Sequence, residues 1–145
     1  MTMINIRRLT INDYDALCAL WQEAGLPYRP NGRDRRENIA SQIEGECSIY
    51  LGAEEGGQLV GAVLGTHDGR KGWINRLAVS PDHRHQGVAA TLVRAVEETC
   101  IELGIEIFAC QIEDWNEASM VVFEHLGYTR HEDIIYFTKR KNSEV

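Results

Sequence analysis

The chain has 145 residues, of which 43% are hydrophobic, and a formal net charge of -7. This length suits one domain with a sizeable core, and the apolar fraction is too high for a disordered chain. The acidic balance argues against nucleic acid as the main partner, because phosphate binding needs a concentrated basic face. The chain has neither an apolar run of the roughly 20 residues that cross a bilayer nor the apolar segment of a signal peptide. We therefore expect a single domain over residues 1–145 that works in the cytoplasm, away from membranes.

The N-terminal half predicts a strand, two helices and a hairpin. "INIRRLT" alternates apolar and polar residues, which indicates a strand. Residues 12–26 carry an apolar stripe at helical spacing and end before Pro27. A loop with four arginines then leads to a short helix near residues 34–43. "CSIYLGAEEGGQLVGAVLGTHDG" predicts two strands joined by a Glu-Gly-Gly turn.

The C-terminal half alternates strands and helices. "WINRLAVS" predicts a strand, and residues 87–103 form a strongly amphipathic helix that Gly104 ends. "IEIFACQI" predicts another strand and "NEASMVVFEHLG" another helix. "YTRHEDIIYFTKR" predicts one or two final strands. This order indicates a mixed α/β fold with one central sheet.

The cysteines and histidines suggest no special chemistry. Cys18, Cys47, Cys100 and Cys110 are widely spaced among apolar neighbours, so we expect buried free thiols in a reducing compartment. The H-x-H pair of His83 and His85 has no cysteine or carboxylate partner at a useful spacing, and His67 lies in a separate turn. We therefore expect no metal site.

The stretch "HRHQGVAATL", residues 83–92, lies between a predicted strand and a predicted helix. The first turn of a helix has unpaired N–H groups and a partial positive charge, and phosphate oxygens satisfy both. The backbone can approach a phosphate closely only where side chains are small, as at Gly87, Ala89 and Ala90. The alternative is an ordinary tight turn that uses Gly87 for its shape. The spacing matches neither a P-loop nor a Rossmann fingerprint.

Two motifs resemble those of a known family. "LAVSPDHRHQGVAATLV" resembles the acyl-CoA pyrophosphate loop of the GNAT superfamily of N-acetyltransferases, with Arg84, Gly87 and Ala89 at its three signature positions. "DWNEASMVVFEHLGY" resembles the family's second hallmark, an asparagine followed by a helix that ends in Leu-Gly-Tyr. The element order also matches, so the resemblance covers nearly the whole chain. It implies a central, mostly antiparallel sheet, splayed at the acyl-CoA site, with helices on both faces.

The resemblance extends to a bacterial subgroup and to individual site residues. "THDGRKG" and "INRLAVSP" resemble small acetyltransferases related to the ribosomal-protein N-terminal type. The resemblance implies acetyl-CoA as co-substrate, no metal, and Trp73 and Asn75 on the acceptor side. The implied cofactor-binding residues are Leu77, Ala78 and Val79 for pantetheine, Arg84, His85, Gln86, Gly87, Val88, Ala89 and Ala90 for the pyrophosphate, and Asn116 for either part.

The resemblance also implies an oxyanion donor, and it leaves the catalytic acid open. The backbone N–H of Val79 takes the oxyanion role at the strand end. Many relatives protonate the leaving thiolate with a tyrosine seven residues after the asparagine, but that position is Phe123 here. Tyr128 and Tyr136 are the nearby candidates, with packing roles as their alternative. Water could also serve, because coenzyme A thiolate is a fairly good leaving group.

The general base departs from the family pattern in the same way. An amine of the lysine type has a pKa of about 10.4, so it must lose a proton before it attacks. The positions at which relatives carry a glutamate are Trp73 and Gln111 here. Glu113 and Asp114 lie just past the following strand and could accept the proton through water. Alternatively, Glu113 and Asp114 are solvated carboxylates of a loop with no catalytic role.

The implied function is an acetyl-CoA-dependent N-acetyltransferase that moves the acetyl group to a primary amine by direct attack in a ternary complex. The alternative is a CoA-binding regulatory or sensing module with little catalysis, and a nucleotide-phosphate binder is a third hypothesis. The sequence leaves the acceptor open among small molecules and protein amines. The arginines at positions 29, 33, 35 and 36 could meet a carboxylate on the acceptor or simply begin a solvated helix. A homodimer is common in the family and is left open.

Overall fold

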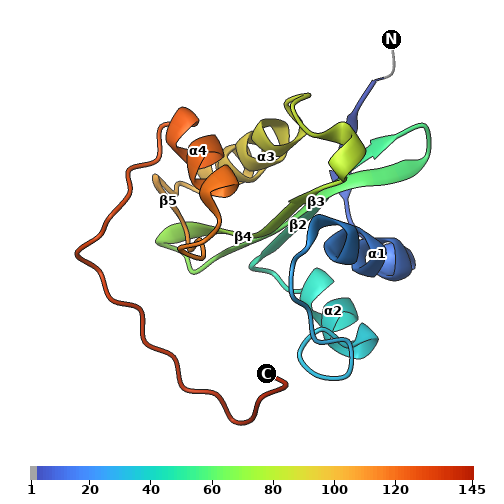
Figure 1. The fold of residues 1–145 in the computed structure, drawn as a ribbon, viewed down its shortest axis with the longest axis horizontal. Helices are drawn as coiled ribbons and strands as arrows, with labels where there is room; N and C mark the ends of the chain where they lie inside the picture. Colours follow the sequence, from blue (N-terminus) through green and yellow to red (C-terminus); the bar gives the residue numbers. More distant parts are fainter. Residues whose placement is uncertain (1–2) are drawn as a thin grey trace.

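A computed structural model describes residues 3–145 and contains one five-stranded sheet (Figure 1). The strands are β1 (Asn5–Arg8), β2 (Ser48–Glu55), β3 (Gln58–His67), β4 (Lys71–Val79) and β5 (Ile107–Cys110), and they lie in that order across the sheet. The first four pair antiparallel, whereas β5 runs parallel to β4. The predicted mixed α/β fold with a mostly antiparallel sheet is confirmed.

Within the described residues 3–145, four helices cover the two faces of the sheet, as the family resemblance implies. Helices α1 (Tyr14–Ala24) and α2 (Arg36–Ile43) lie on one face, and α3 (Val88–Glu102) and α4 (Glu117–His125) lie on the other (Figure 1). Two short 3-10 turns, η1 (Ile11–Asp13) and η2 (Pro81–His83), precede α1 and α3. None of the helices within residues 3–145 is both long and apolar enough to cross a bilayer.

Each face of the sheet has its own apolar core. In β2 the side chains of Ile49 and Leu51 join the core beneath α3, whereas Tyr50 between them joins the core beneath α1. This alternation follows from the two-residue period of a strand. Burying one such aliphatic side chain stabilises the fold by about 1.5–3 kcal/mol. The sheet is therefore held from both sides, and its central strands form a firm base for a site.

Three glycines let α3 lie close to the sheet. A Cβ atom on Gly61 would lie 2.8 Å from Val88 Cγ1, and one on Gly65 would lie 2.9 Å from Val96 Cγ1. A Cβ atom on Gly72 would lie 2.6 Å from the Cys100 sulfur. The absence of side chains at these positions fixes the distance between α3 and the strands beneath it. It thereby also fixes where the N-terminus of α3 lies relative to the end of β4.

The prediction of final strands after residue 128 is wrong. The described residues 128–145 contain no helix or strand, and residues 129–145 are all exposed. A β-strand needs a neighbour to pair with, and this segment runs away from the sheet (Figure 1). The apolar composition of "IIYF" suits a strand, but composition alone supplies no partner.

The prediction of buried thiols holds for only part of the cysteines. All four are free. Cys100 is buried on the sheet-facing side of α3, Cys18 and Cys110 are half-buried, and Cys47 is exposed in the turn before β2. Burial raises the pKa of the Cys110 thiol to about 11, so this thiol is a poor nucleophile at neutral pH.

Candidate active site

One edge of β4 is open along half of its length. β5 pairs only with Lys71–Ile74, and β4 then continues from Asn75 to Val79 with no partner on that side among the described residues. The two strands therefore diverge after Ile74, which gives the splayed sheet that the sequence predicts. The open backbone of Asn75–Val79 can pair with an extended ligand as a neighbouring strand would.

A bulge interrupts β4 at the same place. Ala62 pairs with Ala78 and Leu64 with Asn75, so two residues of β4 lie opposite Val63 alone. Arg76, one of these two residues, has a left-handed φ of 50°. The bulge shifts the alternation of β4, so Ile74 contributes to the core beneath α3 whereas Ala78, four residues later, contributes to the core beneath α1. Leu77 and Val79 consequently face the α3 side.

The loop that follows β4 presents unpaired backbone donors. Within residues 3–145, none of the backbone N–H groups from Arg84 to Ala90 donates a hydrogen bond to a protein acceptor. Gly87 begins α3 with a left-handed φ of 78° and provides no side-chain cap, and His85 is also left-handed at 63°. These unpaired donors and the positive end of the helix dipole are complementary to an anion.

The predicted cofactor residues lie together around this loop. Arg84, His85 and Gln86 are exposed, and Gln86 Nε2 donates to the Asp82 carbonyl at 3.4 Å. Val88 is buried and anchors α3, and Ala89 and Ala90 are half-buried. The Ala78 side chain is buried beneath α1, so it does not face a ligand on the α3 side.

Asn116 has a structural task that the sequence analysis did not anticipate. Its side-chain oxygen accepts a hydrogen bond from the Ser119 N–H at 3.3 Å and thereby caps the N-terminus of α4. The amide nitrogen takes no part in this cap, so it remains suited to donate to a cofactor.

Trp73 and Asn75 lie on the face of β4 opposite Ile74, as alternation predicts. Trp73 is half-buried, and the Lys71 ammonium lies 5.9 Å from the centre of its ring. Asn75 is exposed and donates from Nδ2 to Thr66 Oγ1 at 3.3 Å. This face looks toward α1 and α2, away from the loop before α3.

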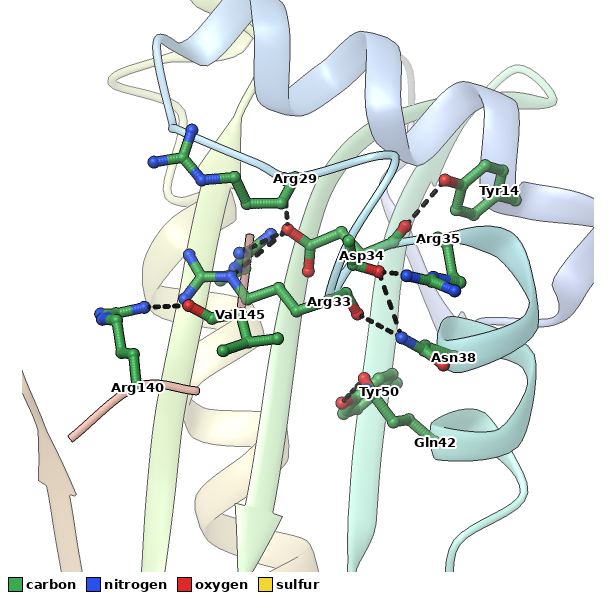
Figure 2. A network of polar contacts seen from close by, with 12 residues as sticks. Tyr14, Arg29, Arg33, Asp34, Arg35, Asn38, Gln42, Tyr50, Arg140 and Val145 are labelled. Carbon is green, nitrogen blue, oxygen red and sulfur yellow. Dashed lines mark hydrogen bonds and ion pairs between the residues drawn. The ribbon is translucent and has the colours of Figure 1, made fainter. Parts of the chain in front are cut away.

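The sequence analysis missed a buried ion pair on the α1 side of β4, the face that the resemblance assigns to the acceptor. Arg76 Nη2 donates to Asp34 Oδ2 at 2.8 Å, and the Arg76 guanidinium lies 4.7 Å from the centre of the Trp21 ring. Asp34 also accepts the Arg29 N–H at 2.7 Å, and its carbonyl accepts the Tyr14 hydroxyl at 2.7 Å (Figure 2). The only sequence signal is a charged residue, Arg76, inside a largely apolar strand. Nothing in the sequence indicates its partner, 42 positions away.

The four loop arginines take on largely local roles. Arg35 Nε donates to the Gly32 carbonyl at 2.9 Å, and the Arg36 guanidinium lies 5.7 Å from the centre of the Tyr14 ring. Arg33 Nε lies 3.6 Å from Asp34 Oδ2. The C-terminus reaches the same loop: the Glu144 carbonyl accepts the Arg33 N–H at 3.0 Å, and Val145 accepts from Arg140 (Figure 2).

The structure ties Tyr128 to helix α3. Its hydroxyl donates to Glu97 Oε2 at 2.6 Å, and its ring packs edge-on against the buried Phe123 ring at 5.0 Å between centroids. Burial and the Glu97 carboxylate raise the pKa of Tyr128 far above its ordinary value. A hydroxyl with a raised pKa gives up its proton less readily, so this contact favours a packing role that links α3 to the segment after α4.

The candidate bases are accessible to solvent. Gln111, Glu113 and Asp114 are exposed in the segment between β5 and α4. The Glu113 carbonyl accepts the Asn116 N–H at 2.9 Å, which forms the turn into α4 and leaves the Glu113 side chain outside the turn. No group of three or more histidines, cysteines or carboxylates within residues 3–145 is arranged to hold a metal ion.

Comparison with known families identifies this arrangement. The model of the acetyltransferase (GNAT) family matches residues 14–128, which contain the open edge of β4, the loop before α3 and helix α4. The chain belongs to the GNAT family of acetyltransferases. It is therefore an N-acetyltransferase, and the family predicted from the two motifs is confirmed. The match ends at Tyr128, so the C-terminal segment lies beyond it.

Solved structures of N-acetyltransferases share the fold over most of the chain. PaiA N-acetyltransferase from Thermoplasma acidophilum in complex with coenzyme A matches with a TM-score of 0.82 at 19% identity, over 91% of this chain and 93% of that chain. Aminoglycoside N-acetyltransferase AAC(6')-Iy in complex with CoA matches with a TM-score of 0.79 at 19% identity, over 97% of both chains. The ribosomal-protein-S18-alanine N-acetyltransferase of Escherichia coli matches with a TM-score of 0.73 at 21% identity, over 86% of this chain and 77% of that chain.

Proposed function

We propose that this enzyme transfers the acetyl group of acetyl-CoA to a primary amine by direct attack within a ternary complex. The observation that carries the proposal is a pair of neighbouring stretches with free backbone groups. The open edge of Asn75–Val79 leads to the unpaired N–H groups of residues 84–90. An extended amide chain that ends in a pyrophosphate is complementary to such a pair, and the CoA arm of acetyl-CoA has this form.

The cofactor would lie along the α3 side of β4. The backbone of Leu77, Ala78 and Val79 would pair with the pantetheine amides, and the N–H groups from Arg84 to Ala90 would bind the pyrophosphate. The Asn116 amide nitrogen would add a side-chain donor. The side chains of Ala78 and Val88 are buried and cannot touch the cofactor. In this assignment these two residues contribute only backbone groups.

The reaction needs a base, an oxyanion donor and a proton for the leaving group. Glu113, exposed where β4 and β5 have diverged, would take the amine proton through a water molecule. The Val79 N–H would stabilise the oxyanion as the new C–N bond forms. The C–S bond then breaks, and solvent protonates the thiolate, because the Tyr128 hydroxyl is already bonded to Glu97.

The acceptor would approach from the side of α1 and α2. Trp73, Asn75 and Arg76 face this side, next to the arginine-containing loop that precedes α2. The matched structures include enzymes named for aminoglycosides and for ribosomal-protein alanine. The positive charge of this region favours an amine that also carries a carboxylate, such as a peptide, over a polycationic aminoglycoside.

Thermal unfolding with acetyl-CoA tests the cofactor assignment. A ligand at 100 times its dissociation constant adds about 2.7 kcal/mol to the free energy of unfolding, which raises the Tm by several degrees. We expect a shift with acetyl-CoA and none with ATP. The Gly87→Ala variant should lose most of this shift, because the new methyl group enters the anion site and strains a φ of 78°. Gly69→Ala is the matched control, because Gly69 also has a left-handed φ, of 82°, and its Cβ would meet nothing within 4 Å. Gly69 lies in the turn before β4, at the end of the strand away from the loop that precedes α3.

Release of free thiol from acetyl-CoA tests catalysis separately from binding. Acidic and neutral peptides and aminoglycosides would be compared as acceptors at equal concentration. Turnover that requires an amine supports the proposal. An acetyl-CoA shift without turnover on any amine would instead support a CoA-binding module.

A further inference from the structure

Part of β4 presents open side chains on the side of α1 and α2. Along the first half of the strand, Gly72 and Ile74 are buried, whereas Lys71 and Asn75 are exposed and Trp73 is half-buried. Side chains alternate along a strand, so these three share the face opposite Ile74. We call Lys71, Trp73 and Asn75 the β4 strip. It leads to the point, after Ile74, at which β4 and β5 diverge.

The first end of the β4 strip is a cationic hollow with an aromatic wall. This hollow, of about 230 Å³, is lined by Asp68, Arg70, Lys71 and Trp73. The Lys71 ammonium lies 5.9 Å from the centre of the Trp73 ring. Asp68 is engaged within the turn, because its Oδ1 accepts the backbone N–H groups of Arg70 at 2.9 Å and Lys71 at 2.8 Å. Two cationic side chains therefore share this hollow with a single carboxylate that already has partners.

The other end of the β4 strip also has more cationic groups than anionic ones. Arg76 Nη2 donates to Asp34 Oδ2 at 2.8 Å, and Arg33 Nε lies 3.6 Å from the same oxygen. One carboxylate neutralises only one of these two guanidinium charges. Figure 2 shows Arg29, Arg33 and Arg140 extending to the same side of Asp34.

Two buried donor atoms at this end have no acceptor. Arg33 Nε and Arg76 Nη1 are buried and have no hydrogen-bond partner within residues 3–145. Buried polar atoms without a partner are rare in folded proteins, so these two atoms point to a ligand with acceptor oxygens. The Arg33 side chain is 40% exposed and holds Asp34 only at the longer distance, so it is free to turn toward such a ligand.

The positive charge of both ends contrasts with the rest of the chain. The formal net charge is -7, so an excess of positive charge is not a general property of this surface. A local patch of one sign attracts a ligand of the opposite sign. From Lys71 to Arg76 a strand spans roughly 16 Å, which is also the length of about five residues of an extended peptide.

We propose that the β4 strip binds an acidic peptide, with one carboxylate at Arg70 and Lys71 and a second, about five residues away, at Arg33 and Arg76. The Trp73 ring lies between the two ends and would pack against an apolar part of the peptide. A polycationic acceptor would instead meet charges of its own sign at both ends. The inference rests on the proposed function in one respect, which is that the bound peptide carries the amine to be acetylated.

Fluorescence anisotropy tests the binding step without turnover. The full chain is saturated with CoA, which has no acetyl group to transfer, and is titrated with short peptides labelled at the C-terminal end. One peptide has two glutamates about five residues apart, the second has glutamines there, and the third has lysines. We expect the glutamate peptide to bind about fivefold tighter than the glutamine peptide or better, and salt should weaken this preference. Equal affinity for the glutamate and glutamine peptides would overturn the proposal.

Two variants assign the preference to the two ends of the strip. Lys71→Gln and Arg33→Gln should each weaken binding of the glutamate peptide by about threefold and leave the glutamine peptide unchanged. Both side chains reach solvent, so the variants should keep the acetyl-CoA shift in Tm. Arg94→Gln is the control, because it removes the same charge from an exposed position on α3, on the other face of the sheet. Equal weakening by Arg94→Gln would mean that only net charge matters, which contradicts a site at the strip.

Thiol release from acetyl-CoA distinguishes a failure of this inference from a failure of the proposed function. Turnover that is equally fast with the glutamate, glutamine and lysine peptides would support the transferase and overturn the acidic preference. Selective binding of the glutamate peptide without thiol release would support the surface and contradict the proposed acetyl transfer to that peptide.

Discussion

The two sides of β4 are built from different parts of the chain. On the α3 side, the candidate cofactor site consists of backbone groups from one continuous stretch, residues 75–90. On the side of α1 and α2, the candidate acceptor site consists of side chains from separate segments, among them Asp34 and Arg76, which are 42 positions apart. Backbone donors depend on local conformation, so most side chains there can change without moving them. The acceptor side depends on a few buried contacts, and each of them should be sensitive to mutation.

The largest expected effect is on the acceptor side, at Asp34. Asp34→Ala leaves the largely buried Arg76 guanidinium without its partner and the Arg29 N–H without an acceptor. Removing one partner of a buried pair costs about 3–5 kcal/mol of stability. Urea denaturation should show this loss, while acetyl-CoA should still raise the Tm. Glu37→Ala, an exposed change in the first turn of α2, is the control and should stay within about 0.5 kcal/mol of the wild type. If Asp34→Ala lowers the free energy of unfolding by less than about 1 kcal/mol, the acceptor side does not depend on this buried contact, and the contrast between the two sides of β4 fails.

The next largest effect is on the cofactor side, through the backbone. Gly61→Ala places a Cβ atom 2.8 Å from Val88 Cγ1 and 3.3 Å from the Ala78 carbonyl, so the start of α3 must move. Overpacking of this kind costs about 1–3 kcal/mol. We expect weaker acetyl-CoA binding by titration calorimetry and an unchanged KM for the acceptor. Gly45→Ala is the control, in the loop before β2, where the new Cβ atom would lie 3.1 Å from the Gln42 carbonyl oxygen. This variant should bind acetyl-CoA as the wild type does. An altered acceptor KM in Gly61→Ala would mean that the two sides are coupled.

A smaller effect is expected at Tyr128, which links α3 to the segment after α4. Tyr128→Phe removes the 2.6 Å hydrogen bond to Glu97, which should cost about 1 kcal/mol of stability. If solvent protonates the thiolate, kcat should not change. A fall in kcat of tenfold or more, together with loss of the alkaline limb of the pH profile, would show that this hydroxyl donates the proton.

The effect that is smallest at neutral pH is on the acceptor side, where Tyr14 contributes a pH dependence only in the alkaline range. Burial raises the pKa of Tyr14 to about 12, against an ordinary value of 10.0. The protonated form is thus favoured in the folded state, and its contribution to stability is complete below pH 10 and is lost as the pH rises toward 12. Wild-type protein should lose more free energy of unfolding across this range than Tyr14→Phe does. Equal losses would mean that folding does not raise the pKa of Tyr14.

The sequence predicted the cofactor side better than the acceptor side. The turn at Gly87, the helix that follows it and the divergence of β4 and β5 were all accessible, because each depends on a short stretch of chain or on the family resemblance. The bulge at Arg76 was not, because strict alternation would place Ile74 and Ala78 on the same face. The cap made by Asn116 and the bond between Tyr128 and Glu97 were also missed, since each depends on where a helix lies in the fold.

The C-terminal arm, residues 129–145, shows that local composition can also predict an element that does not form. The residues of "IIYF" have the composition of a strand, but whether they form one depends on a neighbouring edge that composition cannot supply. The sequence by itself determined the order of the elements up to α4 and predicted an anion site at the start of α3, because hydrophobic period, glycine conformation and helix dipoles act locally. The helices on both faces of the sheet were implied by the family resemblance. Only the tertiary structure decided which charge faces Arg76, which groups hold Tyr128, and that the arm leaves the sheet. Those outcomes depend on contacts between residues far apart in the chain, and such contacts exist only once the sheet and helices have packed.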